Sequence, residues 1–185
     1  MPRGPGRAIL SGMSTTRPHS AFRNGFDLVD GEDLVGSFDG SNWRERGRVR
    51  AGDRTWELRR EGGGRFVLSD QGGDVATAER VRWWSGAWQL DYNGRTLPLT
   101  RASMWGRAYR LTDGDQMVGE VRPTSLRTRV CRVRMPPGLP VHVQVFVVAV
   151  VQTLWRRQQN AASAGAVAGG AAAGGAGAGG AGAGS

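Results

Sequence analysis

Apolar and polar residues alternate in short runs between Trp43 and Met135, and turn residues separate the runs. Alternation with a period of two is typical of strands that bury one face. Paired runs around glycine-bearing turns predict three hairpins, which comprise residues 55–60 with 65–69, 87–92 with 95–100, and 109–112 with 116–121. Further strands are predicted over residues 44–50, 75–84 and 126–135, so we expect an antiparallel barrel or sandwich of eight or more strands.

The longest apolar stretch runs from Leu139 to Trp155 and contains seven valines among residues 141–151. Valine favours strands, but Pro140 suits the first turn of a helix, the arginines at 156–157 suit its C-terminus, and 17 residues are long for one strand. We therefore predict a helix over residues 139–157. Because valines occupy every side of its helical wheel, the helix is expected to be buried all round.

Two environments bury such a helix, a membrane and the interior of a protein. A helix of 17 residues spans about 25 Å, less than the roughly 30 Å of a bilayer's hydrocarbon core, and this one carries three strongly polar residues. We therefore favour a helix that the preceding β-structure encloses. The alternative is a single-pass membrane-anchored β-domain protein in which residues 139–155 form the transmembrane segment.

Composition divides the chain into three parts. Residues 1–25 hold four arginines, three prolines and no acid, and residues 161–185 hold 12 alanines and 10 glycines, so we expect both segments to be disordered. Residues 26–160 are then one domain, of a common size, whose C-terminal core helix covers residues 139–157. The single cysteine, Cys131, and the absence of a secretory apolar segment in residues 1–25 lead us to expect a cytoplasmic protein.

The order of these features resembles a known superfamily. Residues 64–70 (Gly-Arg-Phe-Val-Leu-Ser-Asp) and 118–122 (Val-Gly-Glu-Val-Arg) belong to a Trp-rich meander, and the helix after it opens with Leu-Pro-Val at 139–141 and ends with Leu-Trp-Arg-Arg at 154–157. Over about residues 26–157 the chain resembles the tubby C-terminal-like superfamily, which includes tubby domains, phospholipid scramblases and LURP-one-related proteins, and its short bacterial members are nearest in appearance. The resemblance implies a closed antiparallel barrel of about twelve strands around a buried hydrophobic C-terminal helix. Tubby domains bind phosphoinositides through basic surface residues, but the resemblance assigns that site to no individual position here.

The net charge of +9 comes from 25 arginines and no lysine, which indicates a compositional bias. Its distribution is uneven, because residues 26–120 carry 14 arginines against 16 acids, whereas residues 121–160 carry seven arginines and no acid. Two arginine-bearing strands are therefore candidate contacts for an anion. They contain Arg44, Arg46, Arg48 and Arg50, which share one strand face, and Arg127, Arg129, Arg132 and Arg134, which a one-residue bulge near residues 130–131 would bring to one face.

Residues that carry catalysis or bind metal are scarce. His19 and His142 are the only histidines, and His142 is expected to pack at the start of the helix. Cys131 is predicted to be an inert, packed thiol. The acidic stretches at 30–33 and 113–115 are predicted to be turns, since neither has the spacing of an EF-hand. We therefore predict no catalytic, cofactor-binding or metal-binding residue and no small-molecule substrate, because an enclosed helix leaves no lumen.

Six of the seven tryptophans lie between residues 43 and 105, and most are expected in the core. Trp83 and Trp84 are neighbours in a predicted strand, so one of the two is expected to be exposed.

From these features we expect a non-enzymatic binding protein, cytoplasmic or peripheral at the membrane. The arginine-bearing strands would contact anionic phospholipid headgroups or an acidic protein partner. A nucleic-acid-binding module is a further, less favoured alternative, because the basic composition itself reflects the arginine bias.

Overall fold

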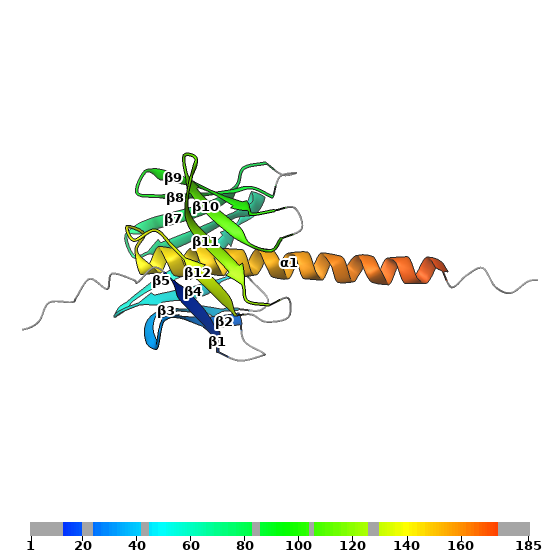
Figure 1. Ribbon diagram of the computed structural model, residues 1–185, viewed down its shortest axis with the longest axis horizontal. Helices are drawn as coiled ribbons and strands as arrows, with labels where there is room; N and C mark the ends of the chain where they lie inside the picture. Colours follow the sequence, from blue (N-terminus) through cyan, green and yellow to red (C-terminus); the bar gives the residue numbers. More distant parts are fainter. Residues whose placement is uncertain are drawn as a thin grey trace, which may run out of the picture. The chain divides into compact units, whose positions relative to one another are not determined.

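Twelve antiparallel strands in the described residues close into a barrel around the first part of one long helix (Figure 1). The structure is a computed structural model that describes residues 13–19, 24–41, 45–82, 86–103, 106–125 and 130–173. The predicted fold class, a closed antiparallel barrel with a C-terminal core helix, is confirmed. The elements are β1 (Ser14–Pro18), β2 (Asn24–Asp30), β3 (Asp33–Gly40), β4 (Gly47–Ala51), β5 (Arg54–Glu61), the 3-10 turn η1 (Gly62–Gly64), β6 (Arg65–Asp70), β7 (Gly73–Arg80), β8 (Trp88–Tyr92), β9 (Arg95–Arg101), β10 (Tyr109–Asp113), β11 (Gln116–Pro123), β12 (Cys131–Arg134) and α1 (Val141–Ala173).

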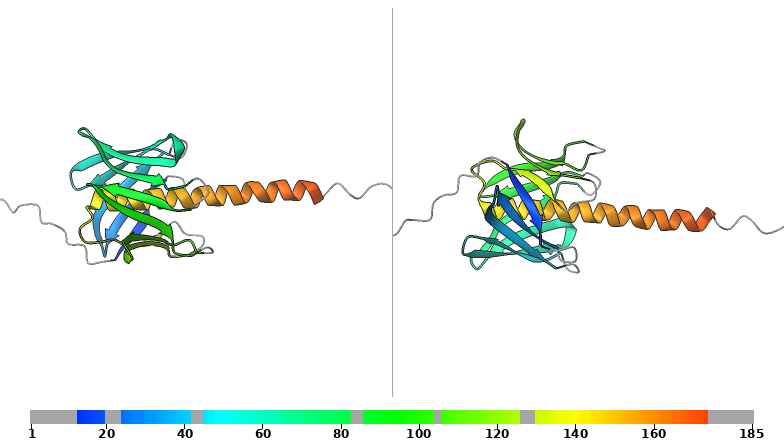
Figure 2. Two further views of the ribbon diagram at one scale, coloured as in Figure 1. Left: turned by 90° about the horizontal axis from the view of Figure 1, so that it is seen from above. Right: turned by 60° about the horizontal axis from the view of Figure 1, so that its bottom comes forward.

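Each strand pairs with its neighbours in sequence, and β1 pairs with β12 to close the barrel. Consecutive strands therefore run in opposite directions, and the chain visits the two barrel ends alternately (Figure 2). We define the near end as the end at which α1 begins; it holds the β2–β3, β4–β5, β6–β7, β8–β9 and β10–β11 turns. The far end holds η1 and the last residues of β1, β3, β7, β9 and β11.

The three predicted hairpins are present, and their strands end within two residues of the predicted positions. In the β8–β9 turn, Asn93 and Gly94 have φ angles of 49° and 72°, which is the left-handed conformation that a type I′ turn requires at both positions. The strands predicted at 44–50, 75–84 and 126–135 correspond to β4, β7 and β12, which are shorter.

The enclosed part of α1 fills the barrel. Every side chain from Val143 to Val151 is at most 3 % exposed, as expected of a helix that is apolar all round. Gly36 on β3 lets the helix lie close to the wall, because a Cβ there would be 2.9 Å from Val145 Cγ2. The polar Gln144 is satisfied locally, since its Nε2 donates to the carbonyl oxygen of Leu139 at 2.7 Å.

The described part of the chain contains no helix that is both long enough and apolar enough to cross a membrane. Residues 143–151 belong to the segment that the alternative interpretation places in a bilayer, and in the structure they are buried in the barrel core.

The prediction of a disordered segment over residues 1–25 is wrong for Ser14–Pro18, which forms the closing strand β1. Its core-facing residues are Ser14 and Thr16, so the strand lacks the apolar alternation that marks the others. Thr16 is satisfied inside the barrel, because its Oγ1 accepts a hydrogen bond of 2.8 Å from the backbone N–H of Cys131. The barrel domain therefore starts at Ser14 and not at Phe26; residues 1–12 and 20–23 lie outside the described residues.

The helix also differs from its predicted bounds of 139–157. It begins at Val141, after Pro140, whose carbonyl accepts from the N–H groups of Val143 and Gln144 at 3.0 Å. It continues to Ala173, because alanine has the highest helix propensity and dominates this stretch. The prediction of disorder over 161–185 is thus wrong for residues 161–173, and residues 174–185 lie outside the described part.

Candidate functional site

The predicted arginines of β12 point out of the barrel. Arg132 and Arg134 are exposed and alternate with the buried Cys131 and Val133, as the strand period requires. Arg127 and Arg129 lie outside the described residues, so the bulge near residues 130–131 stays a prediction.

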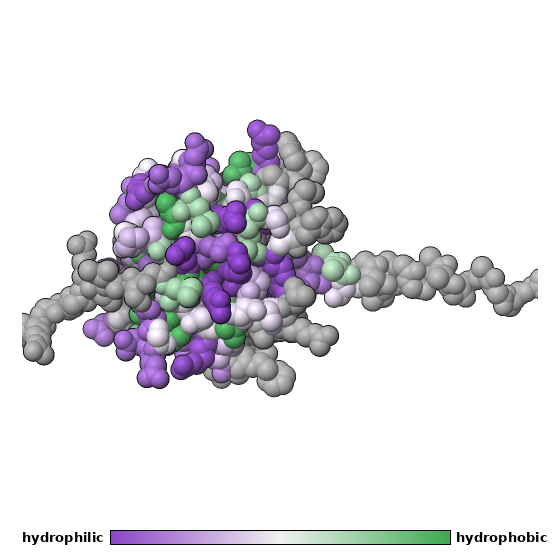
Figure 3. Space-filling view, viewed as in Figure 1, coloured by the Kyte–Doolittle hydropathy of each residue, from purple (hydrophilic) through white to green (hydrophobic). Residues whose placement is uncertain are grey.

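Two arginines on the neighbouring strands extend this surface. Arg122 of β11 is directly opposite Arg132, and Glu120 of β11 lies between Arg134 of β12 and Arg110 of β10. The Glu120 carboxylate accepts from Arg122 Nη2 at 3.1 Å and contacts Arg110 Nε at 3.5 Å. We call Arg110, Arg122, Arg132 and Arg134 the arginine face; in Figure 3, hydrophilic side chains gather where Figure 1 places β11 and β12.

The arginine face has an excess of positive charge. The face holds four guanidinium groups and one carboxylate, Glu120, which contacts Arg110 and Arg122. The side chains of Arg132 and Arg134 make no ion pair or hydrogen bond with another residue of the described part. Like charges directly opposite each other on a sheet, such as Arg122 and Arg132, oppose pairing of their strands. Guanidinium groups with free donors suit a phosphate or carboxylate, which they hold through parallel hydrogen bonds.

The other predicted arginine strand carries balanced charge. Arg48 and Arg50 lie on β4 and Arg46 directly precedes it. All three are exposed on one face, as predicted, and Arg44 lies outside the described residues. Arg48 is opposite Asp39 on one side and Glu57 on the other, and Arg50 Nη1 is 3.3 Å from Asp39 Oδ2. Acids therefore offset the charge of the β4 arginines more fully than Glu120 offsets that of the arginine face.

A shallow groove of about 560 Å³ follows this balanced surface. Its lining includes Arg46 and Arg48 together with Asp39 and Glu57, and glycines of β2, β3 and β4. The structure does not bring the two predicted arginine strands together: β1, β2 and β3 separate β4 from β12 in the barrel, a distance of about 19 Å along the wall at 4.7–4.9 Å per strand.

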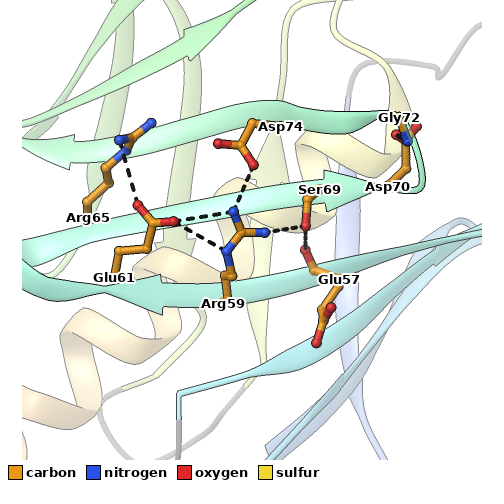
Figure 4. Close-up of polar contacts among 8 residues, drawn as sticks. All are labelled: Glu57, Arg59, Glu61, Arg65, Ser69, Asp70, Gly72 and Asp74. Atoms are coloured by element: carbon orange, nitrogen blue, oxygen red, sulfur yellow. Dashed lines mark hydrogen bonds and ion pairs between the residues drawn. The ribbon is translucent and has the colours of Figure 1, made fainter.

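Arg59 shows how a fully paired arginine of this barrel is held (Figure 4). Its guanidinium donates to Asp74 at 2.8 Å, to Ser69 Oγ at 2.6 Å and to Glu61 at 3.3 Å, and the hydrogen bond to Asp74 raises the pKa of Arg59. Its stem lies opposite the outward-facing Val67, which is buried. Arg59 is therefore part of the wall, whereas the guanidinium groups of Arg132 and Arg134 have no such side-chain partners in the described part.

Charge also separates between the two barrel ends. Each end consists of the terminal two residues of its strands and the described residues of the connections between them. The far end carries twelve arginines and four acids, a formal charge of +8, and the near end carries four arginines and nine acids, a formal charge of −5. Three members of the arginine face, Arg110, Arg122 and Arg132, belong to the far end. The face is thus continuous with the positive end of the barrel.

His142 packs at the start of α1, as predicted. Its ring stacks on Trp56 with 4.2 Å between ring centroids and 9° between planes, and Tyr92 approaches it edge-on. Burial lowers the pKa of His142, the nearby charge of Arg54 lowers it further, and Asp70 acts in the opposite direction.

Acidification is expected to destabilise the fold through His142. Its folded pKa is lowered, so the unfolded chain binds the proton more readily; this contribution to stability is present above the unfolded pKa of about 6.5 and is lost as the pH falls below it. Urea unfolding on either side of that pH measures the loss. His142→Phe keeps a ring against Trp56 and does not titrate, so this variant should lose less stability; an equal loss in both proteins contradicts the assignment.

The structure places Cys131 in the core and the two acidic stretches at turns. Cys131 is fully buried, burial raises the pKa of its thiol, and its Sγ lies 3.2 Å from Thr16 Oγ1, so the cysteine is packed as predicted. Residues 30–33 and 113–115 are at the β2–β3 and β10–β11 turns. Among the residues that the structure describes, no group of three His, Cys, Asp or Glu is placed to hold a metal ion.

Three tryptophans lie within the described residues and bear on the prediction that most tryptophans are in the core. Trp56, Trp88 and Trp155 are buried, at 4 %, 4 % and 5 % exposure. The choice between Trp83 and Trp84 stays a prediction, because both lie outside the described residues.

Sequence reasoning missed Arg110 and Arg122 as members of the arginine face. Their spacing along the chain contains no sign of it, since only the pairing of β11 with β12 places Arg122 beside Arg132. The one available signal was outward parity, which Arg110 has in the predicted strand 109–112 and Arg122 has directly after the predicted strand 116–121.

No protein-family model matches this chain, and a search of the curated proteins finds no match. The resemblance to the tubby C-terminal-like superfamily therefore stays a prediction.

Proposed function

We propose that this barrel binds the anionic headgroups of a phospholipid membrane through its arginine face. The observation that carries the proposal is the ratio of four exposed or partly exposed guanidinium groups to one carboxylate on β10, β11 and β12. Phosphodiester and carboxylate headgroups have the charge and the planar acceptor geometry that guanidinium donors recognise.

Two further features support a surface-binding role. The enclosed helix occupies the barrel interior, where a lumen would otherwise hold a ligand, so recognition falls to the outside of the wall. The far end adds to the positive potential around Arg110, Arg122 and Arg132, which raises the local attraction for an anionic surface. The resemblance to a superfamily with phospholipid-binding members points the same way.

Sedimentation of the full chain with lipid vesicles tests the proposal. We expect binding to vesicles of phosphatidylcholine mixed with phosphatidylserine, little binding to phosphatidylcholine alone, and weaker binding at high salt. Each arginine near an anionic membrane surface contributes about 1 kcal/mol to the free energy of membrane binding. The double variant Arg132→Ser with Arg134→Ser should therefore lower partitioning onto the vesicles at least about tenfold.

The matched control removes the same charge elsewhere. Arg54 and Arg95 lie at the near end, where they pair with Asp70 and Asp113. Arg54→Ser with Arg95→Ser should leave vesicle binding within about twofold of the unsubstituted chain. Equal sedimentation with neutral and anionic vesicles, or equal losses in the two double variants, refutes the proposal.

A further inference from the structure

Uncovered apolar side chains gather at the near end of the barrel. Of the four large hydrophobic residues exposed in the described part, Leu34 at 65 %, Met13 at 62 % and Met117 at 47 % lie at this end, and only Val81 lies at the far end. A bulge in β3 and another in β11 shift the alternation, so Leu34 is opposite Val29 and Met117 is opposite Thr112. Val29 and Thr112 follow the core-facing Leu28 and Leu111, so Leu34 and Met117 lie on the outer side of the rim, where the described side chains leave them uncovered.

These three residues follow one arc of the near end. Strands β3, β2, β1, β12 and β11 are consecutive in the barrel, with Leu34 on the first, Met117 on the last and Met13 directly before the middle one. Neighbouring strands are 4.7–4.9 Å apart, so Met13 is about 10 Å along the rim from each of the other two. We call this segment the near-end arc.

The near-end arc is strongly acidic. Its strand ends and turns hold five acids, which are Asp30, Glu32, Asp33, Asp113 and Asp115, and one arginine, Arg134. The side chains of Glu32, Asp33 and Asp115 make no ion pair or hydrogen bond with another described residue. Acids near the start of α1 stabilise the helix through its dipole, but that effect falls off within one turn. It does not explain why leucine and methionine are exposed beside the acidic turns.

We propose that the near-end arc binds a basic amphipathic helix of a partner protein. Seven residues of an α-helix rise about 10.5 Å, which matches the spacing of Leu34, Met13 and Met117 along the rim. Apolar residues at positions i, i+7 and i+14 lie on one side of such a helix and would meet the three side chains in turn. Arginine or lysine beside them would face the acidic β2–β3 and β10–β11 turns.

This inference does not depend on the lipid proposal, because none of its three apolar residues and none of its five acids belongs to the arginine face. The arginine face and the near-end arc have opposite charge, so one molecule could bind an anionic membrane and a basic helix at the same time.

Fluorescence anisotropy with a designed peptide tests the inference. The probe is a fluorescein-labelled helix of about 18 residues with leucine at i, i+7 and i+14 and lysine on the flanks, titrated with the full chain. We expect saturable binding that Leu34→Ser with Met117→Ser weakens at least tenfold. Val81→Ser, which changes the exposed hydrophobic residue of the far end, is the matched control and should have no effect.

A second variant separates charge from apolar contact. Glu32→Gln, Asp33→Asn and Asp115→Asn together should also weaken binding at least tenfold and remove most of its salt dependence. The inference is overturned if a peptide of the same composition in scrambled order binds equally well, if Val81→Ser weakens binding as much as the double variant, or if the peptide does not bind. Vesicle binding of Leu34→Ser with Met117→Ser should be unchanged, so the two proposals fail independently.

Discussion

A chain shortened to begin at Asn24 is expected to lose cooperative unfolding and to aggregate, because it lacks β1. This strand pairs with β2 on one side and with β12 on the other, so its removal leaves two unpaired edges in place of a closed wall. The buried N–H of Cys131 also loses Thr16 Oγ1, its hydrogen-bond acceptor, which costs about 1–3 kcal/mol by itself.

Comparison with a chain that begins at Met13 makes this experiment specific. That longer chain keeps all twelve strands, so we expect it and the full chain each to unfold in urea in one transition. Circular dichroism follows the transitions, and light scattering follows aggregation. If the chain that begins at Asn24 unfolds with the same midpoint and slope as the chain that begins at Met13, β1 does not close the barrel.

The hairpins and the core helix were predictable because their signals are local. Alternating residues bounded by Asn93-Gly94 specify a strand, a turn and a second strand without reference to the rest of the chain. The valine-rich stretch has no polar side, and this property alone requires that something encloses it.

The start of the barrel was not predictable in the same way. Strand β1 faces the core with Ser14 and Thr16, whose burial is tolerable only because Thr16 meets the backbone of Cys131, 115 residues later in the chain. On β3, Gly36 occupies a core-facing position because α1 lies against it. Contacts with residues far away in the sequence explain both Thr16 and Gly36, and the pattern of a short segment does not reveal such contacts.

In the candidate site, too, the local features were predictable from the sequence and the contacts between strands were not. Strand parity correctly predicted that Arg132, Arg134, Arg48 and Arg50 face outward. The register between strands determines the charge around each arginine. It places Arg122 beside Arg132, but it places Asp39 and Glu57 beside Arg48.

Summing charge along the chain hid the polarity of the barrel. Residues 26–120 appear nearly neutral, with 14 arginines and 16 acids, because a meander reaches the basic end and the acidic end alternately every few residues. Adding the charges of alternate turns separates the two ends. The charged residues and the order of the predicted turns can both be read from the sequence, so this sum needs no structure.

Phe146→Ala is expected to lower the free energy of unfolding by about 3–5 kcal/mol, at the upper part of that range. Phe146 is 0 % exposed and lies on the enclosed part of α1, between valines that are also fully buried. The cost of such a substitution depends on how far the surroundings collapse into the cavity. Here the surroundings are a closed wall of hydrogen-bonded strands whose circumference is fixed by strand number and register, so the wall moves inward little and the cavity persists.

Leu34→Ala is the control for Phe146→Ala, since it also removes an apolar side chain but at a position that is 65 % exposed. It should cost less than about 1 kcal/mol, because little apolar surface leaves water at that position on folding. Urea unfolding at one pH and temperature measures both variants, and the slope of each transition shows whether the unfolded state has changed. Equal costs for the two substitutions would mean that the wall does not enclose α1. A large cost for Phe146→Ala alone, with an unchanged slope, is the result that a closed barrel around a helix requires.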